Sequence, residues 1–579
     1  MSGRYDNPRT LVATATYNER ENIPILLERI HGLEGDLEAL VVDDNSPDGT
    51  GRFLEELSAA DGRLHVVHRP AKMGLGSAHQ LAFLYAIHHG FDRLVTMDAD
   101  MSHSPDNIPQ LLKALEDADV VIGSRYTEGG TTDYSGYRKL LSVCANTLAR
   151  LLLRLPFREY TTSFRAFDVK VLSKKRCTKL RSRGYSFFME TVFRLHSAGA
   201  RMTEVPIQFR DRHAGVSKIP HFEVFSGITK LFRLAASSIT GRNKFKPAAE
   251  IDDECCYCGS RFMIEIYPAS GSEPEGRGGA EAYRCTNMDH KNTPQIIQCL
   301  QCGLMQVPGK SQPEGIEVLY SDVEDPTYMD NRAARELNFE KTFERIESFL
   351  PETGSMLEIG AFCGLFLAQA EKRGWRCQGV EPSRWAARIA REEAGVEVLT
   401  GTLGDNRESL KDDYDLAVAW DVLEHVPDPY GLLTEIHRHL RPGGILCLST
   451  LDRHNWLPRL TGRHWPWIMD MHLQYFSRDF LEGMLARAGY EVVHVADYTH
   501  YATLPYLWRK MAAQLPGLLA PALALFAKAL PAAIILPVSF GDVKLFIARK
   551  HHDADAAPER TPDGLGFSHQ SKKNDFMPS

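Results

Sequence analysis

Short apolar runs alternate with helical patterns through the first third of this 579-residue chain. An apolar run at 11–15 precedes an amphipathic stretch at 22–32, and further apolar runs follow at 39–42, 65–67 and 94–97. Short apolar runs separated by helical patterns are typical of parallel strands joined by crossover helices. The pattern therefore predicts an α/β domain whose ligands bind at the carboxyl ends of its strands.

Polar side chains follow the strands of this predicted sheet. Tyr17 and Glu19 come after the first strand, Asp44 comes after the second, and Asp98 and Asp100 come after the fourth. An acidic pair at a strand end suits Mg²⁺ or Mn²⁺, because these ions prefer one or two carboxylates together with phosphate oxygens. An Asp-x-Asp sequence alone is more typical of a solvated loop, so its interpretation depends on neighbouring motifs.

Six further motifs accompany the acidic pair. They are Ala15-Thr-Tyr-Asn-Glu19, Val42-Asp-Asp-Asn-Ser-Pro-Asp-Gly-Thr50, Lys72-Met-Gly-Leu-Gly76, Gly123-Ser-Arg-Tyr126, Thr162-Ser-Phe-Arg165 and Arg212-His-Ala-Gly-Val-Ser-Lys218. Over residues 8–240 the series closely resembles the family 2 glycosyltransferases of the dolichyl (polyprenyl) phosphate mannose synthase type. The resemblance implies a GT-A fold and inverting transfer of a hexose to a polyprenyl phosphate. GDP-mannose is the expected donor, and UDP-glucose or another nucleotide sugar is the alternative.

The resemblance also implies the residues of this site. Ala15 stands where the family usually has proline, and Ser102 stands where some members have glutamine, so metal ligation at Ser102 would go through water. A phosphate acceptor is already a dianion at neutral pH, so the reaction needs cations rather than a general base. The implied roles are the nucleoside for Tyr17, Glu19, Val42 and Asp44, the metal and diphosphate for Asp98, Ala99 and Asp100, and the phosphates for Arg125, Arg212 and Lys218.

A lipid acceptor requires contact with a bilayer. Residues 137–155 and 221–246 are predicted to form amphipathic helices with basic residues, which suits an anionic membrane surface. The alternative for both is an ordinary helix packed on the sheet with a solvated face. Residues 515–540 are almost entirely apolar, but four prolines would break a membrane span, so short interfacial helices or burial in the fold are expected.

The net charge and the N-terminal sequence limit the kinds of partner and the cellular compartment that we expect for this chain. The net charge of −8 and the pI near 6.3 give no electrostatic surface for nucleic acid. Residues 1–10 lack the apolar core of a signal peptide, which predicts a cytoplasmic protein. We expect a peripheral enzyme at the cytoplasmic face of the membrane, in contact with it directly or through a membrane-anchoring partner.

Two Cys-x-x-Cys pairs follow the first predicted domain. Their separation of about forty residues is typical of a zinc ribbon, in which four thiolates hold a tetrahedral Zn²⁺. Cys256, Cys285 and His290 lie nearby and leave the ligand set open. A loop of reduced cysteines without metal is the alternative. The expected ligands of this structural zinc are Cys255, Cys258, Cys299 and Cys302.

A second α/β unit begins near residue 356 with a strand, a glycine turn and a helix. Gly360 and Gly364 allow the backbone to approach a ligand, and Glu381, at the end of the next strand, can bind both hydroxyls of a ribose. This arrangement alone is compatible with NAD or with S-adenosylmethionine. Phe362 occupies the middle glycine position of the dinucleotide pattern, which disfavours a pyrophosphate.

Two later motifs decide between these cofactors. Residues 415–429, with Asp421 and His425, and residues 440–450 resemble the fourth and fifth strand regions of class I S-adenosylmethionine-dependent methyltransferases, over residues 340–550. The preceding cysteine pairs make the arrangement similar to methyltransferases of sugar pathways, including sugar C-methyltransferases. The resemblance implies a Rossmann-like fold. The implied cofactor residues are Glu358, Gly360 and Gly364 at the methionine end, Glu381 at the ribose, Thr402 and Leu403 at the adenine edge, and Asp421.

A base is needed only if the methyl acceptor must lose a proton. His425, His472 and Tyr475 are the candidates, although a histidine in a Leu-Glu-His turn is more often structural. The chain is thus predicted to hold a GT-A glycosyltransferase (8–240), a zinc-ribbon-like connector (250–340), a class I methyltransferase (341–550) and a disordered tail (551–579). The predicted protein is a bifunctional enzyme that methylates a glycan, a sugar or a lipid-linked intermediate. The rival hypothesis makes one half a non-catalytic scaffold.

Overall fold

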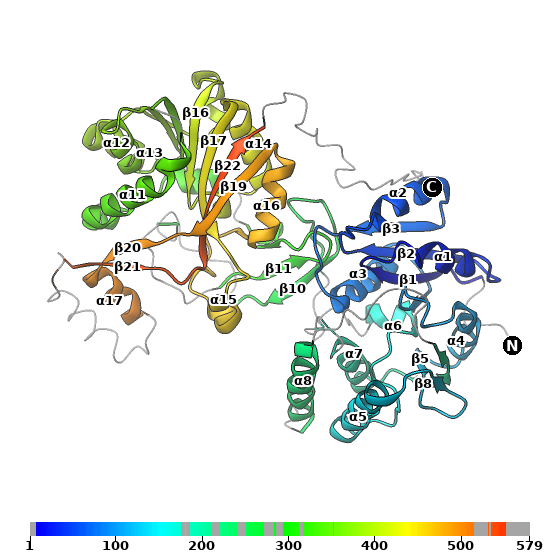
Figure 1. The fold of residues 1–579 in the computed structure, drawn as a ribbon. Helices are drawn as coiled ribbons and strands as arrows, with labels where there is room; N and C mark the ends of the chain where they lie inside the picture. The colour runs from blue at the N-terminus through cyan, green and yellow to red at the C-terminus, as the bar shows by residue number, and fades with distance from the viewer. Residues whose placement is uncertain are drawn as a thin grey trace, which may run out of the picture.

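Two large sheets, with a small sheet between them, form the architecture of this computed structural model (Figure 1). The first large sheet belongs to the N-terminal half of the chain and the second to the C-terminal half. The described residues are 7–174, 180, 184, 186–210, 221–239, 251–270, 283–284, 293–312, 316–350, 353–513, 531 and 534–551.

The N-terminal sheet has the strand order β3-β2-β1-β4-β7-β5-β8, with β7 antiparallel to both of its neighbours. Its strands are β1 (Thr10–Thr16), β2 (Leu37–Asp43), β3 (Leu64–His68), β4 (Arg93–Thr96), β5 (Val120–Ser124), β7 (Arg165–Asp168) and β8 (Met202–Pro206). The helices are α1 (Ile23–His31), α2 (Thr50–Ala60), α3 (Leu75–His88), α4 (Ile108–Ala114), α5 (Gly136–Leu153), α6 (Val169–Lys174), α7 (Ser186–Ser197) and α8 (His221–Ile239), and a short pair joins β6 (Thr131–Thr132) to β9 (Gln208–Phe209).

The side chains of β1 explain why this sheet is buried on both faces. Leu11 and Ala13 pack in one core cluster with α3, whereas Val12 packs in the opposite cluster with Ile23 of α1. Alternate residues of a strand point to opposite faces, so a continuous apolar run requires a covering layer on each side. The predicted α/β domain is therefore present, and β1, β2 and β4 run parallel with their carboxyl ends at one edge.

The C-terminal sheet has the order β15-β14-β13-β16-β17-β22-β19. The strands from β15 to β17 pair in parallel, and β22 is antiparallel to both of its neighbours, β17 and β19. Its strands are β13 (Ser355–Ile359), β14 (Arg376–Glu381), β15 (Val398–Thr400), β16 (Tyr414–Trp420), β17 (Leu440–Leu451), β19 (Tyr490–Asp497) and β22 (Val543–Lys550). The helices of this half are α9 (Ile316–Ser321), α10 (Pro326–Asp330), α11 (Arg332–Ile346), α12 (Leu365–Glu371), α13 (Arg384–Ile389), α14 (Pro429–His439), α15 (Trp456–Thr461), α16 (Arg478–Arg487) and α17 (Leu504–Ala513).

The small sheet contacts both halves of the molecule. It contains β10 (Met263–Tyr267), β11 (Ile296–Cys299) and β12 (Met305–Gln306), and β12 pairs with β18 (Gln474–Tyr475) of the C-terminal half. Ile264 and Leu300 pack in the cluster that contains α3, and the ring of Phe262 lies 5.7 Å from that of Tyr85. Arg453 Nη2 donates to the carbonyl of Gly303 at 2.8 Å. The connector is thus completed by one half and packed against the other.

No helix among the described residues is long and apolar enough to cross a membrane. Short interfacial helices or burial in the fold were expected for the apolar segment at 515–540. In its described part, Ile535–Val538 form strand β21, paired with β20 (His500–Thr503). Pro537 is tolerated there because the sheet has only two strands, so the missing N–H interrupts no central ladder. Residues 514–530 and the predicted tail from 552 onward lie outside the described residues.

Candidate active sites

Hydrogen bonds tie the loop after β1 to the loop after β2. The backbone N–H of Asn18 donates to Ser46 Oγ at 2.9 Å, and that of Glu19 donates to Thr50 Oγ1 at 3.2 Å. Asn18 and Asn45 adopt left-handed backbone conformations, with φ of 59° and 56°, which asparagine tolerates better than most residues. The sequence Tyr-Asn-Glu and the Asp-Asp-Asn-Ser motif therefore build one continuous rim at the sheet edge.

Two of the expected nucleoside residues have well-defined surroundings in this rim. Lys72 Nζ lies 4.6 Å from the centroid of the Tyr17 ring. Asp44 forms a buried ion pair with Arg69, whose Nε donates to Asp44 Oδ1 at 2.5 Å. Burial outweighs the arginine and raises the pKa of Asp44 to about 6. Val42 is buried in the core, so its contact with a nucleoside would come from its backbone.

The Asp98 and Asp100 carboxylates follow β4 and are each held by a serine. Ser163 Oγ donates to Asp98 Oδ1 at 2.6 Å, and Ser102 donates to Asp100 Oδ1 from its hydroxyl at 2.6 Å and from its backbone at 3.1 Å. His103 is buried, which lowers its pKa, and its Nδ1 accepts from the Asp98 N–H at 3.3 Å. Ser102 therefore positions Asp100 directly, and its water-mediated metal contact stays a prediction.

Arg125 is buried at the end of β5 and paired with the buried carboxylate of Glu159. Its Nε and Nη2 donate to the two Glu159 oxygens at 2.8 and 2.9 Å, and Nη2 also donates to Thr161 Oγ1 at 2.8 Å. The sequence predicts that Arg125 contacts phosphate. The structure shows its ion pair with Glu159, and the phosphate contact stays a prediction. The other two expected cations, Arg212 and Lys218, lie outside the described residues.

The glycine turn of the C-terminal half requires glycine for backbone and packing reasons. Gly360 and Gly364 both have φ of 71°, a conformation that L side chains rarely adopt. A Cβ on Gly360 would lie 2.7 Å from Val422 Cγ2, and one on Gly364 would lie 2.6 Å from Val396 Cγ2. The turn therefore brings bare backbone to the edge of the sheet, next to the buried Glu358.

Glu381 closes this turn from the neighbouring strand. The backbone N–H groups of Phe362 and Ser383 donate to Glu381 Oε2 and Oε1, each at 2.8 Å. Burial nevertheless raises the pKa of Glu381 to about 7, and it raises the pKa of Glu358 well above its usual range, with Glu381 contributing. Neither carboxyl forms an ion pair with a basic side chain in the described part of the chain. The turn thus has two buried acids that no basic side chain of the described residues neutralises.

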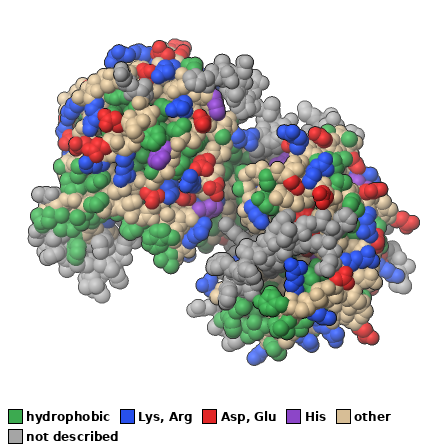
Figure 2. Space-filling view, in the orientation of Figure 1, with side chains coloured by type: hydrophobic (Ala, Val, Ile, Leu, Met, Phe, Trp, Pro, Cys, Tyr) green, Lys and Arg blue, Asp and Glu red, His purple; other side chains and the backbone are tan. Residues whose placement is uncertain are grey.

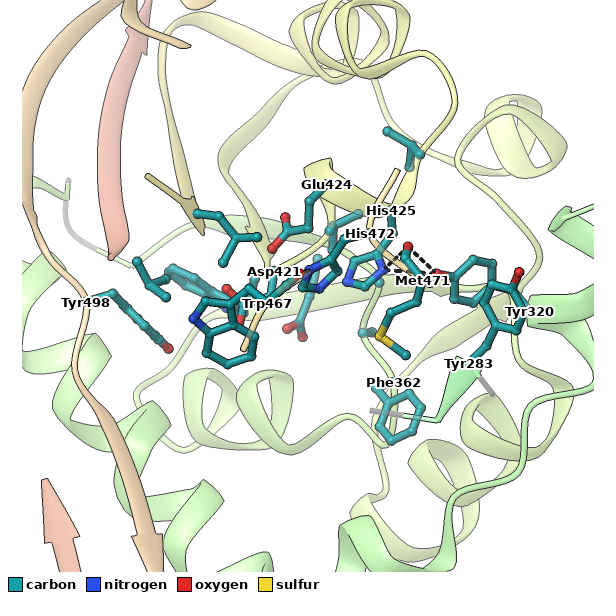
Figure 3. Close-up of a pocket in the computed structure, with 18 of the residues that line it drawn as sticks. Tyr283, Tyr320, Phe362, Asp421, Glu424, His425, Trp467, Met471, His472 and Tyr498 are labelled. Atoms are coloured by element: carbon teal, nitrogen blue, oxygen red, sulfur yellow. Dashed lines mark hydrogen bonds between the residues drawn. The ribbon is translucent and has the colours of Figure 1, made fainter. Parts of the chain in front are cut away.

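A cavity of about 1430 Å³ begins at this turn (Figure 3). Glu358 and Glu381 line it. Figure 3 shows Asp421, Trp467 and Tyr498 in its wall. Ser449 Oγ donates to Asp421 Oδ1 at 2.7 Å, which fixes that carboxylate. The expected cofactor residues that line this cavity are Glu358, Gly360, Glu381, Thr402, Leu403 and Asp421.

Two of the three candidate bases line the cavity. His425 Nδ1 lies 3.0 Å from the Met471 carbonyl and 2.9 Å from the Tyr320 hydroxyl, and burial lowers its pKa to about 4. His472 Nδ1 lies 2.7 Å from the Trp467 carbonyl, and the two imidazole centroids are 4.8 Å apart. Tyr475, the third candidate, is only 1% exposed and packs in the core.

The four paired cysteines of the connector converge. Cys255 Sγ lies 3.5 Å from Cys302 Sγ, and Cys258 Sγ lies 3.6 Å from Cys299 Sγ. A tetrahedral zinc ion with Zn–S bonds of about 2.3 Å places its sulfurs about 3.8 Å apart, so these thiols fit the ion. The Cys256 thiol instead lies 3.4 Å from Gln474 Oε1, whereas Cys285 and His290 lie outside the described residues.

Residues 11–175 match glycosyl transferase family 2. A polyprenol monophosphomannose synthase of Mycolicibacterium smegmatis is 42% identical over 237 residues, which cover 40% of this chain and 88% of that protein. The chain belongs to glycosyl transferase family 2. An undecaprenyl-phosphate mannosyltransferase of Micrococcus luteus is 40% identical over 212 residues, covering 36% of this chain and 87% of the relative. The GT-A-like fold predicted for this half of the family member is thus confirmed.

The second half of this family 2 protein matches another family. Residues 328–495 match a methyltransferase domain. Among solved structures, a SAM-dependent methyltransferase of Thermotoga maritima is 24% identical and matches 38% of this chain and 90% of its own, with a TM-score of 0.26. One of Archaeoglobus fulgidus is 15% identical and matches 39% and 100%, with a TM-score of 0.28. The chain therefore combines a family 2 glycosyltransferase with a methyltransferase domain. The sheet of that domain, in the order β15-β14-β13-β16-β17-β22-β19, is Rossmann-like.

Sequence reasoning missed several residues that shape the two sites. Arg69 and Glu159 neutralise Asp44 and Arg125, but neither stands out in the sequence. Glu424 was also missed, although it directly precedes His425 in the Leu-Glu-His turn that had been singled out. The signal that could have identified it is an acidic residue directly before a candidate histidine.

Proposed function

We propose that the N-terminal half transfers mannose from GDP-mannose to a polyprenyl phosphate with inversion of configuration. The observation that carries this proposal is the match to two mannose-transferring relatives along almost their whole length. Three of the family motifs follow β1, β2 and β4, whose carboxyl ends share one edge of the sheet. Asp98 and Asp100 are the proposed ligands of Mg²⁺ or Mn²⁺ at that edge.

The residues present suit this chemistry. An acceptor phosphate oxygen attacks the anomeric carbon, and the bond from that carbon to the departing diphosphate breaks. A divalent ion bound by the acidic pair would stabilise the negative charge on the departing nucleotide. Asp44, held by Arg69, would accept hydrogen bonds from the nucleoside. Tyr17 would pack against the nucleoside. The proposed phosphate contacts are Arg125, Arg212 and Lys218.

For the C-terminal half we propose methylation of a glycan, a sugar or a lipid-linked intermediate, with S-adenosylmethionine as the methyl donor. Glu381 is the proposed ribose ligand, Glu358 and the glycine turn would lie at the methionine end, and Leu403 would lie at the adenine. Because the donor carries a sulfonium and an ammonium group, a site with buried, uncompensated acids favours it electrostatically. In-line displacement at the methyl group then depends mainly on alignment.

We also propose roles for the cysteine cluster of the connector and for an apolar surface on the N-terminal half. Cys255, Cys258, Cys299 and Cys302 would hold a structural zinc ion that fixes the connector between the two halves. Apolar side chains gather over α5 at the lower edge of the N-terminal half (Figure 2), where Tyr137 is 73% and Leu151 is 68% exposed. Together with basic residues of α5, this face would rest on the cytoplasmic side of an anionic membrane, alone or with an anchoring partner.

The glycosyltransferase proposal is tested with purified full-length protein, GDP-mannose, Mg²⁺ and a short polyprenyl phosphate. Lipid-linked mannose is the expected product, measured by extraction and mass spectrometry. Asp100→Ala should lower the rate by about 10²- to 10³-fold, the usual effect of losing one group that stabilises transition-state charge. Asp117→Ala, which removes an exposed carboxylate outside the site, is the matched control. Full activity in Asp100→Ala, or no product with any nucleotide sugar, would overturn the proposal.

The methyltransferase proposal is tested by titrating the protein with S-adenosylmethionine in a calorimeter. Gly364→Val should weaken binding by at least about tenfold, because the new side chain meets Val396 and Ala390 and strains the left-handed backbone. Gly483→Ala in α16 is the matched control, since its added Cβ meets only open space. If the unaltered protein does not bind S-adenosylmethionine, this half is a scaffold instead.

A further inference from the structure

A cluster of three potential metal ligands lies beside the methyl-donor site. Glu424 and His425 belong to the short turn Leu423–His425 after β16, and His472 precedes β18. One ligand atom from each of these side chains lies within 4.8 Å of the other two. Figure 3 shows the Glu424 carboxylate directed toward the His472 ring, with His425 next to it. We propose that these three residues bind a divalent transition-metal ion in the methyltransferase cavity.

The hydrogen bonds around the cluster are those expected of metal ligands. The Met471 carbonyl lies 3.0 Å from His425 Nδ1, and the Trp467 carbonyl lies 2.7 Å from His472 Nδ1. A carbonyl can only accept, so Nδ1 carries the proton in both rings and the lone pair resides on Nε2. Metal-binding histidines usually donate their other ring N–H to a carbonyl or a carboxylate in this way, which fixes the tautomer and the ring orientation.

The carboxylate ligand is oriented in the same manner. Thr450 Oγ1 donates to Glu424 Oε2 at 2.9 Å, and Glu424 is only 1% exposed. With bonds of about 2.1 Å, the ligands of a tetrahedral ion lie about 3.4 Å apart. Ligand atoms that lie within 4.8 Å of one another therefore need side-chain shifts of up to about 1.4 Å to bind the ion.

The three ligands indicate which ions would bind and what the bound ion could do. Two imidazoles and one carboxylate suit Zn²⁺, Fe²⁺ or Mn²⁺ better than Mg²⁺, which prefers oxygen ligands alone. Three protein ligands leave a coordination position open, unlike the four thiols of the connector, which would close theirs. Because Glu424, His425 and His472 all line the cavity, an ion can enter, and its open position can take an oxygen atom of a bound molecule. A metal-free hydrogen-bond network is the competing interpretation.

Cobalt titration of the full-length protein distinguishes these interpretations. All proteins carry Asp100→Ala, so that the N-terminal acidic pair does not bind the ion. The protein is stripped of metal and titrated with Co²⁺, whose thiolate complexes give intense charge-transfer bands and whose nitrogen and oxygen complexes give only weak visible bands. We expect two equivalents of bound Co²⁺, one with each spectrum.

Two variants assign the second equivalent. His472→Ala should abolish the weak-band equivalent and keep the thiolate one, and Glu424→Gln, which preserves the side-chain shape, should weaken it at least about tenfold. His464→Ala, which removes an exposed histidine outside the cavity, should retain both equivalents. Retention of the thiolate equivalent and of the parent's far-ultraviolet circular dichroism spectrum shows that each variant is folded.

Either of two results overturns the proposal. One is a parent protein that binds Co²⁺ only with the thiolate spectrum, and the other is a second equivalent that both variants retain unchanged. The titration needs no methyl transfer, so its failure is distinct from a failure of the proposed methyltransferase activity, which the calorimetric titration of the methyl donor measures.

Discussion

The two candidate sites of this chain bury acidic side chains but balance their charge differently. In the N-terminal half, Asp44 pairs with Arg69 and Glu159 pairs with Arg125, all of them buried. In the C-terminal half, Glu358 and Glu381 are equally buried, yet neither forms an ion pair within the described residues. In the N-terminal half these two buried acids thus each face an arginine, although burial still raises the pKa of Asp44, whereas the two buried acids of the C-terminal half have no basic partner within the described residues.

This difference follows from the charge of the proposed ligands. A nucleotide sugar brings a negative diphosphate, so an unpaired buried carboxylate beside it would repel the ligand, and the arginines prevent this. S-adenosylmethionine brings positive charge, so its own binding can supply the missing partner of a buried acid. We therefore expect the arginine pairs of the N-terminal site to be formed before its ligand binds, and the buried acids of the C-terminal site to gain a positively charged partner only when the methyl donor binds.

Breaking the Asp44–Arg69 pair should have the largest effect on stability. Arg69→Met leaves a buried carboxylate without its partner, which destabilises a fold by about 3–5 kcal/mol. Because the chain has two large domains, we expect more than one unfolding transition, and calorimetry can resolve them. The transition whose temperature shifts on adding nucleotide sugar is assigned to the N-terminal half. We expect only that transition to fall in temperature.

Two further variants show whether charge imbalance is the cause. The double change Arg69→Met with Asp44→Leu removes both charges and should recover at least half of the lost stability, because apolar replacements of buried ion pairs are often neutral. Arg388→Met breaks an exposed pair with Glu392 and should cost less than about 1 kcal/mol. If the double variant is no more stable than Arg69→Met, lost packing is responsible and the contrast between the sites fails.

In the C-terminal half, the expected effect is a dependence of stability on pH. Burial raises the pKa of Glu381 from 4.5 to about 7, so the folded chain binds more protons than the unfolded chain between these values. The contribution of Glu381 to stability therefore falls as the pH rises from about 4.5 to about 7, by about 3 kcal/mol. Glu381→Gln should flatten this part of the profile, as measured by denaturant unfolding without ligand.

The methyl donor should reverse this dependence. Because the ionised Glu381 interacts best with a cation and with ribose hydroxyls, S-adenosylmethionine should bind more tightly above pH 7 than at pH 5.5. Glu381→Gln should lose both the affinity and its pH dependence. Glu408→Gln, at an exposed position outside the cavity, is the control. Equal affinity at both pH values in the parent protein would show that Glu381 is not electrostatically coupled to the ligand.

Local sequence patterns predicted the framework of both sites because they determine local structure. The apolar runs predicted the strands of both sheets, and Gly360 and Gly364 predicted the tight turn that their backbone φ of 71° requires. The two cysteine pairs predicted a cluster whose sulfurs converge. Each of these inferences depends on residues that lie close together in the chain, or on a chemistry that admits few alternatives.

The partners across the fold could not be predicted in this way. Arg125 was interpreted as a phosphate ligand, but its main contact, Glu159, lies 34 residues away and is reached only through tertiary packing. Tyr475 was a candidate base until β18 proved to be a buried strand paired with β12 of the connector. A single sequence records which charges exist, whereas the packed structure decides which of them neutralise one another.

The smallest expected effect is on nucleotide-sugar binding, and it comes from an exposed lysine of the N-terminal site. Lys72 is exposed and lies over the Tyr17 ring at 4.6 Å, in contrast to the buried arginines. An exposed cation–π contact contributes about 0.5–1 kcal/mol, so Lys72→Met should weaken nucleotide-sugar binding about two- to fivefold. Lys113→Met, on the exposed face of α4, should leave binding unchanged. A loss of affinity of a hundredfold or more would instead identify Lys72 as a direct phosphate ligand. The positive charges of this site would then include an exposed lysine as well as the buried arginines.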